Sequence, residues 1–284
     1  MSRAGDVAVF RVSSFNQNTT QQLLQYLAAA QGQAPSRLHG IVLDLRGDAG
    51  GLLDQAVSLA DVFILGGPIA ATTGRHPASR QLFEASGHSP VPHMPIVVLI
   101  NGGSASASEV VAAALQDAGR AVVVGSSSYG KGTVQTVAPL PNGGALTLTW
   151  AVLLAPSGYP LNGHGVVPTL CTSDLGDDGQ ALRIALERAG SVSLSPLAPR
   201  PRASLSEADW SQLRRSCPER LGDHAIDMTV AERLLADPDL FSQAVHVIAP
   251  IAKLAAGGSG AASAAARPDL TGSPGSLLSG THAP

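Results

Sequence analysis

The chain has 284 residues, of which 44% are hydrophobic and 14% are charged, and its formal net charge is −3. This length suffices to bury a core without disulfides or metal ions, in one large domain or two small ones. The small negative charge and the lack of a basic block exclude nucleic acid as an expected partner. No apolar run approaches the roughly 20 residues that span a membrane. Cys171 and Cys217 are isolated in sequence, so a disulfide and two buried thiols are both compatible with the pattern.

The first 125 residues alternate between strand and helix patterns. Apolar periodicity predicts strands at 6–11, 39–45, 68–73, 95–100 and 121–124, and helices at 19–30, 52–64 and 106–117. Residues 75–92 have no clear period, which predicts a loop or flap. The alternation as a whole predicts an α/β core with a mostly parallel sheet.

The pattern changes in the second half of the chain. Two further strands, 133–140 and 145–154, are predicted to form a hairpin around the turn at 141–144. Helices are predicted at 178–189, 206–215, 229–236 and 239–248, with a Pro/Ser-rich linker at 190–204 and a Thr229…Glu232 capping box. The dominance of Gly, Ser, Ala and Pro from residue 255 predicts a disordered tail. The expected parts are therefore a core (1–175), a helical extension (176–254) and a tail (255–284).

A turn of small residues, 103–108, joins a predicted buried strand to a predicted helix and carries Ser106. The start of a helix offers unpaired backbone N–H groups and the positive end of the helix dipole, and both suit an oxyanion. Serine is also a favoured N-cap residue, so the turn alone is more typical of ordinary helix capping.

Lys131 gives this turn a chemical partner. The chain has 18 basic residues, of which only Lys131 and Lys253 are lysines, and Lys131 is the one in the well-patterned part. A desolvated lysine can lose its proton, whereas arginine effectively cannot. Lys131 follows the next predicted strand, at the sheet edge that also carries the Ser106 turn. The pair predicts a serine nucleophile with a lysine base. Strand alternation would put Gln135 on the same face as Lys131, where its amide could orient the lysine amine.

Two other motifs compete with this interpretation. Residues 125–131 nearly spell a phosphate-binding P-loop, but Gly132 stands where the motif needs Ser or Thr, and a strand pattern follows. A Ser/His/Asp triad would need a base such as His164, and the Gly-x-Ser-x-Gly elbow is missing around Ser106. The spacing of His, Asp and Glu suggests no metal site, and no cofactor is expected.

A second Gly-rich junction covers residues 44–51. Gly50 and Gly51 can bring backbone N–H groups close to a substrate carbonyl, or can simply permit a tight turn. Asp44 and Arg46 are expected to form a scaffold ion pair or a turn-capping pair rather than to act in catalysis.

Three runs of sequence carry a family resemblance. LDLRGDAGG (43–51), NGGSASASEVVAAALQDAGRAVVVG (101–125) and YGKGTVQ (129–135), in this order and spacing, resemble the carboxyl-terminal processing (tail-specific) proteases of peptidase family S41. The resemblance covers about residues 5–168 and includes PSGYPLNGHGVVPT (156–169) as a closing segment. It implies a ClpP/crotonase-like core and a serine endopeptidase that works through a Ser/Lys dyad and an acyl-enzyme, without a cofactor.

The resemblance also implies roles for single residues. Ser106 would be the nucleophile, Lys131 its general base and Gln135 the partner of that base. The backbone amides of Ala107 and of one glycine of the Gly50-Gly51 pair would form the oxyanion hole, and Asp117 would give structural support. The expected partners are protein or peptide substrates, with a homo-oligomer or a regulatory adaptor as further options.

Members of this family usually carry an export signal and a PDZ domain before the matched segment, and the printed sequence shows neither. The resemblance implies a periplasmic or other extracytoplasmic location, whereas the chain as written, if complete, would be cytoplasmic. A non-catalytic peptide-binding or assembly module of the same fold, a truncated inactive fragment and a crotonase-like acyl transferase or hydrolase are the alternatives.

Overall fold

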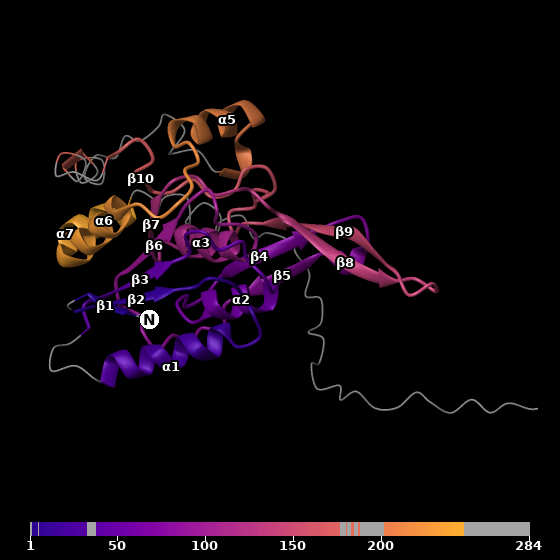
Figure 1. Cartoon of the computed structure of the whole chain (residues 1–284), viewed down its shortest axis with the longest axis horizontal. Coiled ribbons are helices and arrows are strands. Elements are labelled where there is room, and N and C mark those ends of the chain that lie inside the picture. Colours follow the sequence, from indigo (N-terminus) through magenta and orange to yellow (C-terminus); the bar gives the residue numbers. More distant parts are fainter. Residues whose placement is uncertain are drawn as a thin grey trace, which may run out of the picture.

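The computed structural model describes residues 2–4, 6–32, 38–176, 180, 183–184, 187 and 202–246 (Figure 1). Its strands are β1 (Ser2–Ala4), β2 (Val7–Arg11), β3 (Gly40–Asp44), β4 (Pro68–Thr73), β5 (Gln81–Glu84), β6 (Ile96–Ile100), β7 (Val122–Gly125), β8 (Thr133–Pro139), β9 (Ala145–Leu154) and β10 (Leu170–Cys171). Its helices are α1 (Thr19–Gly32), α2 (Leu53–Asp61), α3 (Ala107–Asp117), α5 (Glu207–Ser216), α6 (Ala225–Ala236) and α7 (Pro238–His246), with 3-10 turns η1 (Pro77–Ser79) and η2 (Arg202–Ser204).

A six-stranded sheet in the order β1-β2-β3-β6-β7-β10 forms the centre of the molecule. β1 is antiparallel to β2, and the remaining neighbours pair in parallel. Every residue of β3, β6 and β7 is buried, as expected for parallel strands covered on both faces. This confirms the predicted α/β fold with a mostly parallel sheet.

Alternate strand residues point into two separate hydrophobic cores, one on each face of the sheet. Ile41, Leu43, Ile96 and Val98 pack with residues of α1, α2 and α3. Val42, Val97, Leu99, Val122 and Val124 pack with residues of α6 and α7. Two of the helices predicted for the C-terminal extension, α6 and α7, therefore cover the second face of the central sheet.

A second sheet, in the order β5-β4-β9-β8, is antiparallel and extends away from the central one (Figure 1). β8 and β9 form the predicted hairpin, and β9 is exposed from Ala145 to Trp150 and buried at Ala151 and Leu153. The prediction of a loop at 75–92 is wrong in part, because η1 and β5 lie within it. β5 is short and its residues are mostly exposed, so it carries little apolar pattern. Its strand conformation comes from backbone pairing with β4.

The start of α6 differs from the prediction as well. The helix begins at Ala225, and Thr229 lies inside it with its Oγ1 donating to Ala225 O at 3.1 Å, so the predicted Thr229…Glu232 capping box is wrong. Ile226 in the first turn is buried in the second core, and this packing extends the helix beyond its local signal.

Several predictions fall on residues that the structure does not describe. The helix at 178–189 and the linker at 190–204 lie mostly outside the described residues, and the tail at 255–284 lies wholly outside them. The division into three parts therefore stays a prediction. In the described part of the chain, no helix has the length and apolar character to cross a membrane. Cys171 and Cys217 form a disulfide, which decides between the two alternatives left open by the sequence.

Candidate active site

The loops after β3, β6 and β7 meet at one edge of the central sheet, because these three strands are parallel neighbours. The first two loops touch at Gly50, whose φ is +98°. A Cβ added there would lie 2.6 Å from Ala105 O and 2.9 Å from both Ala107 N and Ser106 Cβ. Only glycine fits this approach, so the predicted oxyanion glycine lies directly against the Ser106 turn.

Ser106 occupies the N-cap position of α3 with an unusual backbone conformation. Its φ of 57° makes it the one non-glycine residue with a positive φ in the described part of the chain. Such residues cost about 1–3 kcal/mol and cluster at functional sites. The neighbouring serines, Ser104 and Ser108, are fully buried and donate their hydroxyls to Leu45 O (2.8 Å) and Asp48 O (3.0 Å). Ser106 is half-buried, so it is the accessible hydroxyl of the three.

Glu109 links the Ser106 turn to the Lys131 loop. Its Oε2 accepts the backbone N–H of Ser106 at 2.8 Å and that of Lys131 at 2.9 Å. Its Oε1 accepts Ser128 Oγ and Gly130 N, both at 2.5 Å. The side chain is fully buried, and burial raises its pKa while these four hydrogen bonds oppose that shift. One carboxylate thus fixes the backbone of both residues.

Glu109 was missed by sequence reasoning, although a signal for it exists. Ser106-x-x-Glu109 has the spacing of a capping box, in which the glutamate binds the N-cap N–H. The bond to Ser106 N follows from that motif. The bonds to Gly130 and Lys131 depend on tertiary packing, so the motif does not predict them.

Lys131 lies in the loop before β8, and its side chain is exposed. Gly132 packs so closely that an added Cβ would lie 2.1 Å from Asn162 N. No Ser or Thr can therefore stand at this position as a P-loop requires, and a strand follows instead of a helix. The P-loop interpretation is wrong.

Gln135 is exposed on β8 opposite Thr149. The argument from strand alternation does not apply to it, because Lys131 precedes β8, which begins at Thr133. A role for Gln135 in orienting the amine stays a prediction.

The proposed oxyanion glycines are held by the loop that carries Asp48. Gly50 N donates to Asp48 Oδ1 at 2.8 Å, so a substrate oxyanion would compete with this carboxylate for that N–H. Two backbone bonds hold the loop to Phe15, from Phe15 N to Gly50 O (3.0 Å) and from Leu52 N to Phe15 O (2.9 Å), and neither uses the N–H of Gly51. Burial raises the pKa of Asp48 to about 6. Its Oδ2 is buried without a hydrogen-bond partner among the described residues.

Two further predicted residues have structural contacts. Asp117 is buried at the end of α3, and its Oδ2 accepts both the N–H (2.9 Å) and the hydroxyl (2.6 Å) of Ser157. Burial raises the pKa of Asp117. The ring of His164, the alternative base, stacks on Trp210 with centroids 4.7 Å apart, and its Nε2 lies 3.5 Å from Glu207 Oε1. These contacts are those of a packed side chain.

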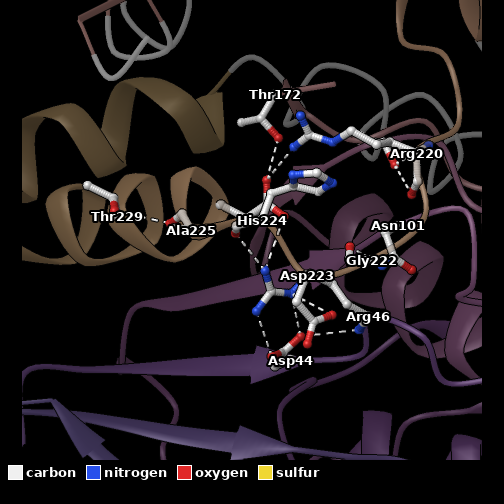
Figure 2. A network of polar contacts seen from close by, with 12 residues as sticks. Asp44, Arg46, Asn101, Thr172, Arg220, Gly222, Asp223, His224, Ala225 and Thr229 are labelled. Atoms are coloured by element: carbon white, nitrogen blue, oxygen red, sulfur yellow. Dashed lines mark hydrogen bonds and ion pairs between the residues drawn. The ribbon is translucent and has the colours of Figure 1, made fainter. Parts of the chain in front are cut away.

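Asp44 and Arg46 form the buried ion pair that the sequence predicts. Arg46 Nε donates to Asp44 Oδ1 and Arg46 Nη2 to Asp44 Oδ2, both at 2.9 Å. Arg46 Nη1 reaches Asp227 Oδ2 at 3.2 Å, which ties the end of β3 to α6 (Figure 2).

The model of peptidase family S41 matches residues 6–171, more than half of the chain. The chain belongs to peptidase family S41. This confirms the resemblance found in the sequence, and the match contains the turn with Ser106, the loop with Lys131 and the glycine pair.

Similar proteins agree with this assignment to family S41. The chain is 46% identical over 167 residues to a carboxy-terminal-processing protease of Bartonella bacilliformis, covering 58% of this chain and 38% of that protein. It is 35% identical over 190 residues to the chloroplastic C-terminal processing peptidase of Tetradesmus obliquus, covering 67% and 39%. Among solved structures, the photosystem II D1 C-terminal processing protease matches with a TM-score of 0.50 at 36% identity, covering 57% of this chain and 41% of that one. The chain thus spans about two fifths of the length of these relatives.

Proposed function

We propose that this chain is the catalytic core of a serine endopeptidase, of the ClpP/crotonase type, in which Ser106 is the nucleophile and Lys131 the general base. The observation that carries the proposal is the buried Glu109 carboxylate, which accepts the N–H of both residues through one oxygen. Two backbone groups bonded to the same atom must be close together, although they lie 25 residues apart in the sequence. The strained, half-buried Ser106 supports the same assignment.

The reaction would proceed through an acyl-enzyme. Ser106 Oγ attacks the carbonyl carbon of the scissile peptide bond while Lys131 Nζ accepts its proton. The N–H of Ala107 and that of Gly50 or Gly51 stabilise the oxyanion. Collapse of the tetrahedral intermediate breaks the C–N bond, and Lys131 returns the proton to the leaving amine. A water molecule then attacks the ester by the same route and releases Ser106.

Protein substrates with accessible C-terminal tails fit this core, because the similar proteins are named as C-terminal processing proteases. The Cys171–Cys217 disulfide supports an extracytoplasmic location, since disulfides persist in oxidising compartments.

A second candidate function is a non-catalytic peptide-binding or assembly module, or an inactive fragment. The exposed side chain of Lys131 favours it, because a lysine acts as a base only when it is desolvated. In the catalytic proposal, bound substrate or further parts of a longer protein supply that desolvation.

Labelling with a serine-reactive fluorophosphonate separates the two functions. We expect one label per chain, located on Ser106 by peptide mass spectrometry, and cleavage of an unfolded protein such as casein. Ser106→Ala should remove both the label and the cleavage. Ser211→Ala, at an exposed serine of α5 outside the loops of the site, is the matched control and should keep both. Absence of label from the folded wild-type chain would favour the non-catalytic module.

A further inference from the structure

A segment beyond the region matched by the family model crosses two of the active-site loops. This segment, residues 214–222, is called the clamp here. Arg220 O accepts the N–H of Gly102 at 3.0 Å, and Gly222 O accepts Asn101 Nδ2 at 2.8 Å. Asn101 Oδ1 in turn accepts the N–H groups of Gly47 and Gly103, both at 2.9 Å. The clamp therefore holds the loop that leads to Ser106, and through Asn101 it reaches the glycine-rich loop.

The clamp also binds three consecutive buried serines of the loop that leads to Lys131. Arg220 N donates to Ser126 Oγ at 3.1 Å, and Ser127 Oγ donates to Cys217 O at 2.6 Å. Arg214 Nη2 donates to Ser128 O at 3.0 Å. Each of the three serines is thus fixed from outside the matched region.

Arg214 is the clamp residue with the shortest path to the site. Its Nη1 donates to His164 O at 2.5 Å, and its Nη2 also pairs with Glu219. Ser128, whose carbonyl it binds, donates its hydroxyl to Glu109 Oε1. Glu109 holds the N–H of Ser106 and of Lys131, so a single side chain separates Ser128 from both.

The clamp is fixed to the core at two points. At the first, Cys217 is disulfide-bonded to Cys171 at the end of β10. At the second, Figure 2 shows Arg220 and Thr172 converging with Arg46 on the first turns of α6. There the buried Asp227 accepts Thr172 Oγ1 at 2.6 Å and lies 3.6 Å from Arg220 Nη2 and 3.2 Å from Arg46 Nη1.

We propose that the clamp sets the relative position of Ser106 and Lys131, with Arg214 as the positioning residue, and that the Cys171–Cys217 disulfide makes peptidase activity depend on the redox state. The inference rests on the proposed function. A misplaced loop lowers the rate of the chemical step more than it weakens substrate binding, because only the transition state requires nucleophile and base in register. Reduction by a dithiol breaks the S–S bond, gives two protein thiols and leaves the reagent as a cyclic disulfide.

The first test compares Arg214→Gln with Arg215→Gln in the full chain. Arg215 is the next residue and is exposed, so it controls for charge and for the helix. We expect Arg214→Gln to lower kcat at least tenfold with KM changed less than threefold, and Arg214→Lys to fall between it and the wild type. The rate of fluorophosphonate labelling at Ser106 should fall in parallel. Equal kcat and labelling rates in Arg214→Gln and Arg215→Gln would overturn the role of Arg214.

The second test treats the wild type and a Cys171→Ser/Cys217→Ser variant with dithiothreitol. The wild type should lose activity at least fivefold on reduction and recover it on reoxidation, whereas the variant should start low and not respond. Unchanged activity after complete reduction, verified by thiol counting, would overturn redox dependence.

Hydrogen exchange separates failure of the inference from failure of the proposed function. If the wild type neither labels nor cleaves, the proposed function fails. The clamp is then judged by exchange alone, which should be faster at residues 126–131 in Arg214→Gln than in Arg215→Gln. Equal exchange rates there would overturn the clamp as well.

Discussion

The two halves of the candidate site are built differently. Ser106 lies in a turn that the fold holds in place. Its backbone is strained, the serines on either side of it are buried, and α3 begins at the next residue. Lys131 is held through its backbone N–H, its side chain is exposed, and the hairpin that follows is exposed over most of its outer half. The proposed nucleophile is therefore preorganised by the core itself. In the proposed function, bound substrate or further parts of a longer protein complete the environment of the proposed base.

Removing the Glu109 carboxylate, which hydrogen-bonds to the backbone of both Ser106 and Lys131, should have the largest effect. Glu109→Gln keeps the shape of the side chain but places an NH₂ group against N–H or O–H donors, so buried groups lose their acceptor. We expect a loss of about 2–4 kcal/mol in the free energy of unfolding and of at least 10²-fold in kcat. Denaturant unfolding and casein cleavage measure the two effects.

Glu232→Gln, at an exposed glutamate of α6, is the matched control and should change neither quantity appreciably. If Glu109→Gln behaved like this control, the carboxylate would not be the connection between Ser106 and Lys131.

Asp48 tests how firmly the glycine-rich loop is preorganised. Burial raises its pKa from 3.8 to about 6, so the folded state prefers the protonated form. The contribution of Asp48 to the free energy of unfolding is then largest below pH 4 and falls as the pH rises through about 6, because the folded chain must lose a proton that it binds more tightly than the unfolded chain does. Asp48→Asn does not titrate at this position. The difference in the free energy of unfolding between Asp48→Asn and the wild type should therefore grow in favour of the variant between pH 4 and pH 8.

The upper limit of this growth is about 3 kcal/mol, at 1.36 kcal/mol per pKa unit, and solvent screening should reduce it to about 1–2 kcal/mol. Urea unfolding at several pH values measures it. Asp54→Asn, at an exposed aspartate of α2, is the control. A constant difference in the free energy of unfolding between Asp48→Asn and wild type across this pH range would contradict the raised pKa of the buried Asp48 carboxyl.

The strain at Ser106 should produce a smaller effect. A residue with φ of 57° favours glycine, so Ser106→Gly should be more stable than Ser106→Ala by about 1 kcal/mol, and both should be inactive. At Ser211, an exposed position inside α5, the order should reverse because alanine favours helix. Thermal unfolding of the four variants checks both orders. Ser106→Ala equal to or more stable than Ser106→Gly would mean that the turn is not strained.

The same contrast explains how much the sequence could predict. The strands β2, β3, β6 and β7 were predicted within about two residues, because buried parallel strands are short apolar runs that end in turn residues. The edge that brings Ser106 and Lys131 together followed from parallel topology. For the glycines at 50 and 51 the sequence left two roles open, approach to a substrate carbonyl or a tight turn, and the structure shows that both lie in close contact with neighbouring backbone.

What could not be predicted depends on contacts between distant residues. The reach of Glu109 to Gly130 and Lys131, the pairing of Cys171 with Cys217 and the clamp all arise from packing that no local pattern encodes. The start of α6 and the existence of β5 were missed for the same reason. Lys131 precedes β8, which begins at Thr133, so the strand alternation on which the predicted orientation of Gln135 relied does not extend to Lys131.

The most direct test of the central claim compares Lys131→Arg with Lys131→Ala in a protein-cleavage assay. A lysine that accepts the proton of Ser106 cannot be replaced by arginine, whose guanidinium stays charged at any usable pH. We expect both variants to lose about 10²–10⁴-fold or more in kcat, with Arg nearly as inactive as Ala. Both should keep the wild-type fold, because the side chain at 131 is exposed. Substantial activity in Lys131→Arg would contradict the dyad and leave Lys131 with an electrostatic role.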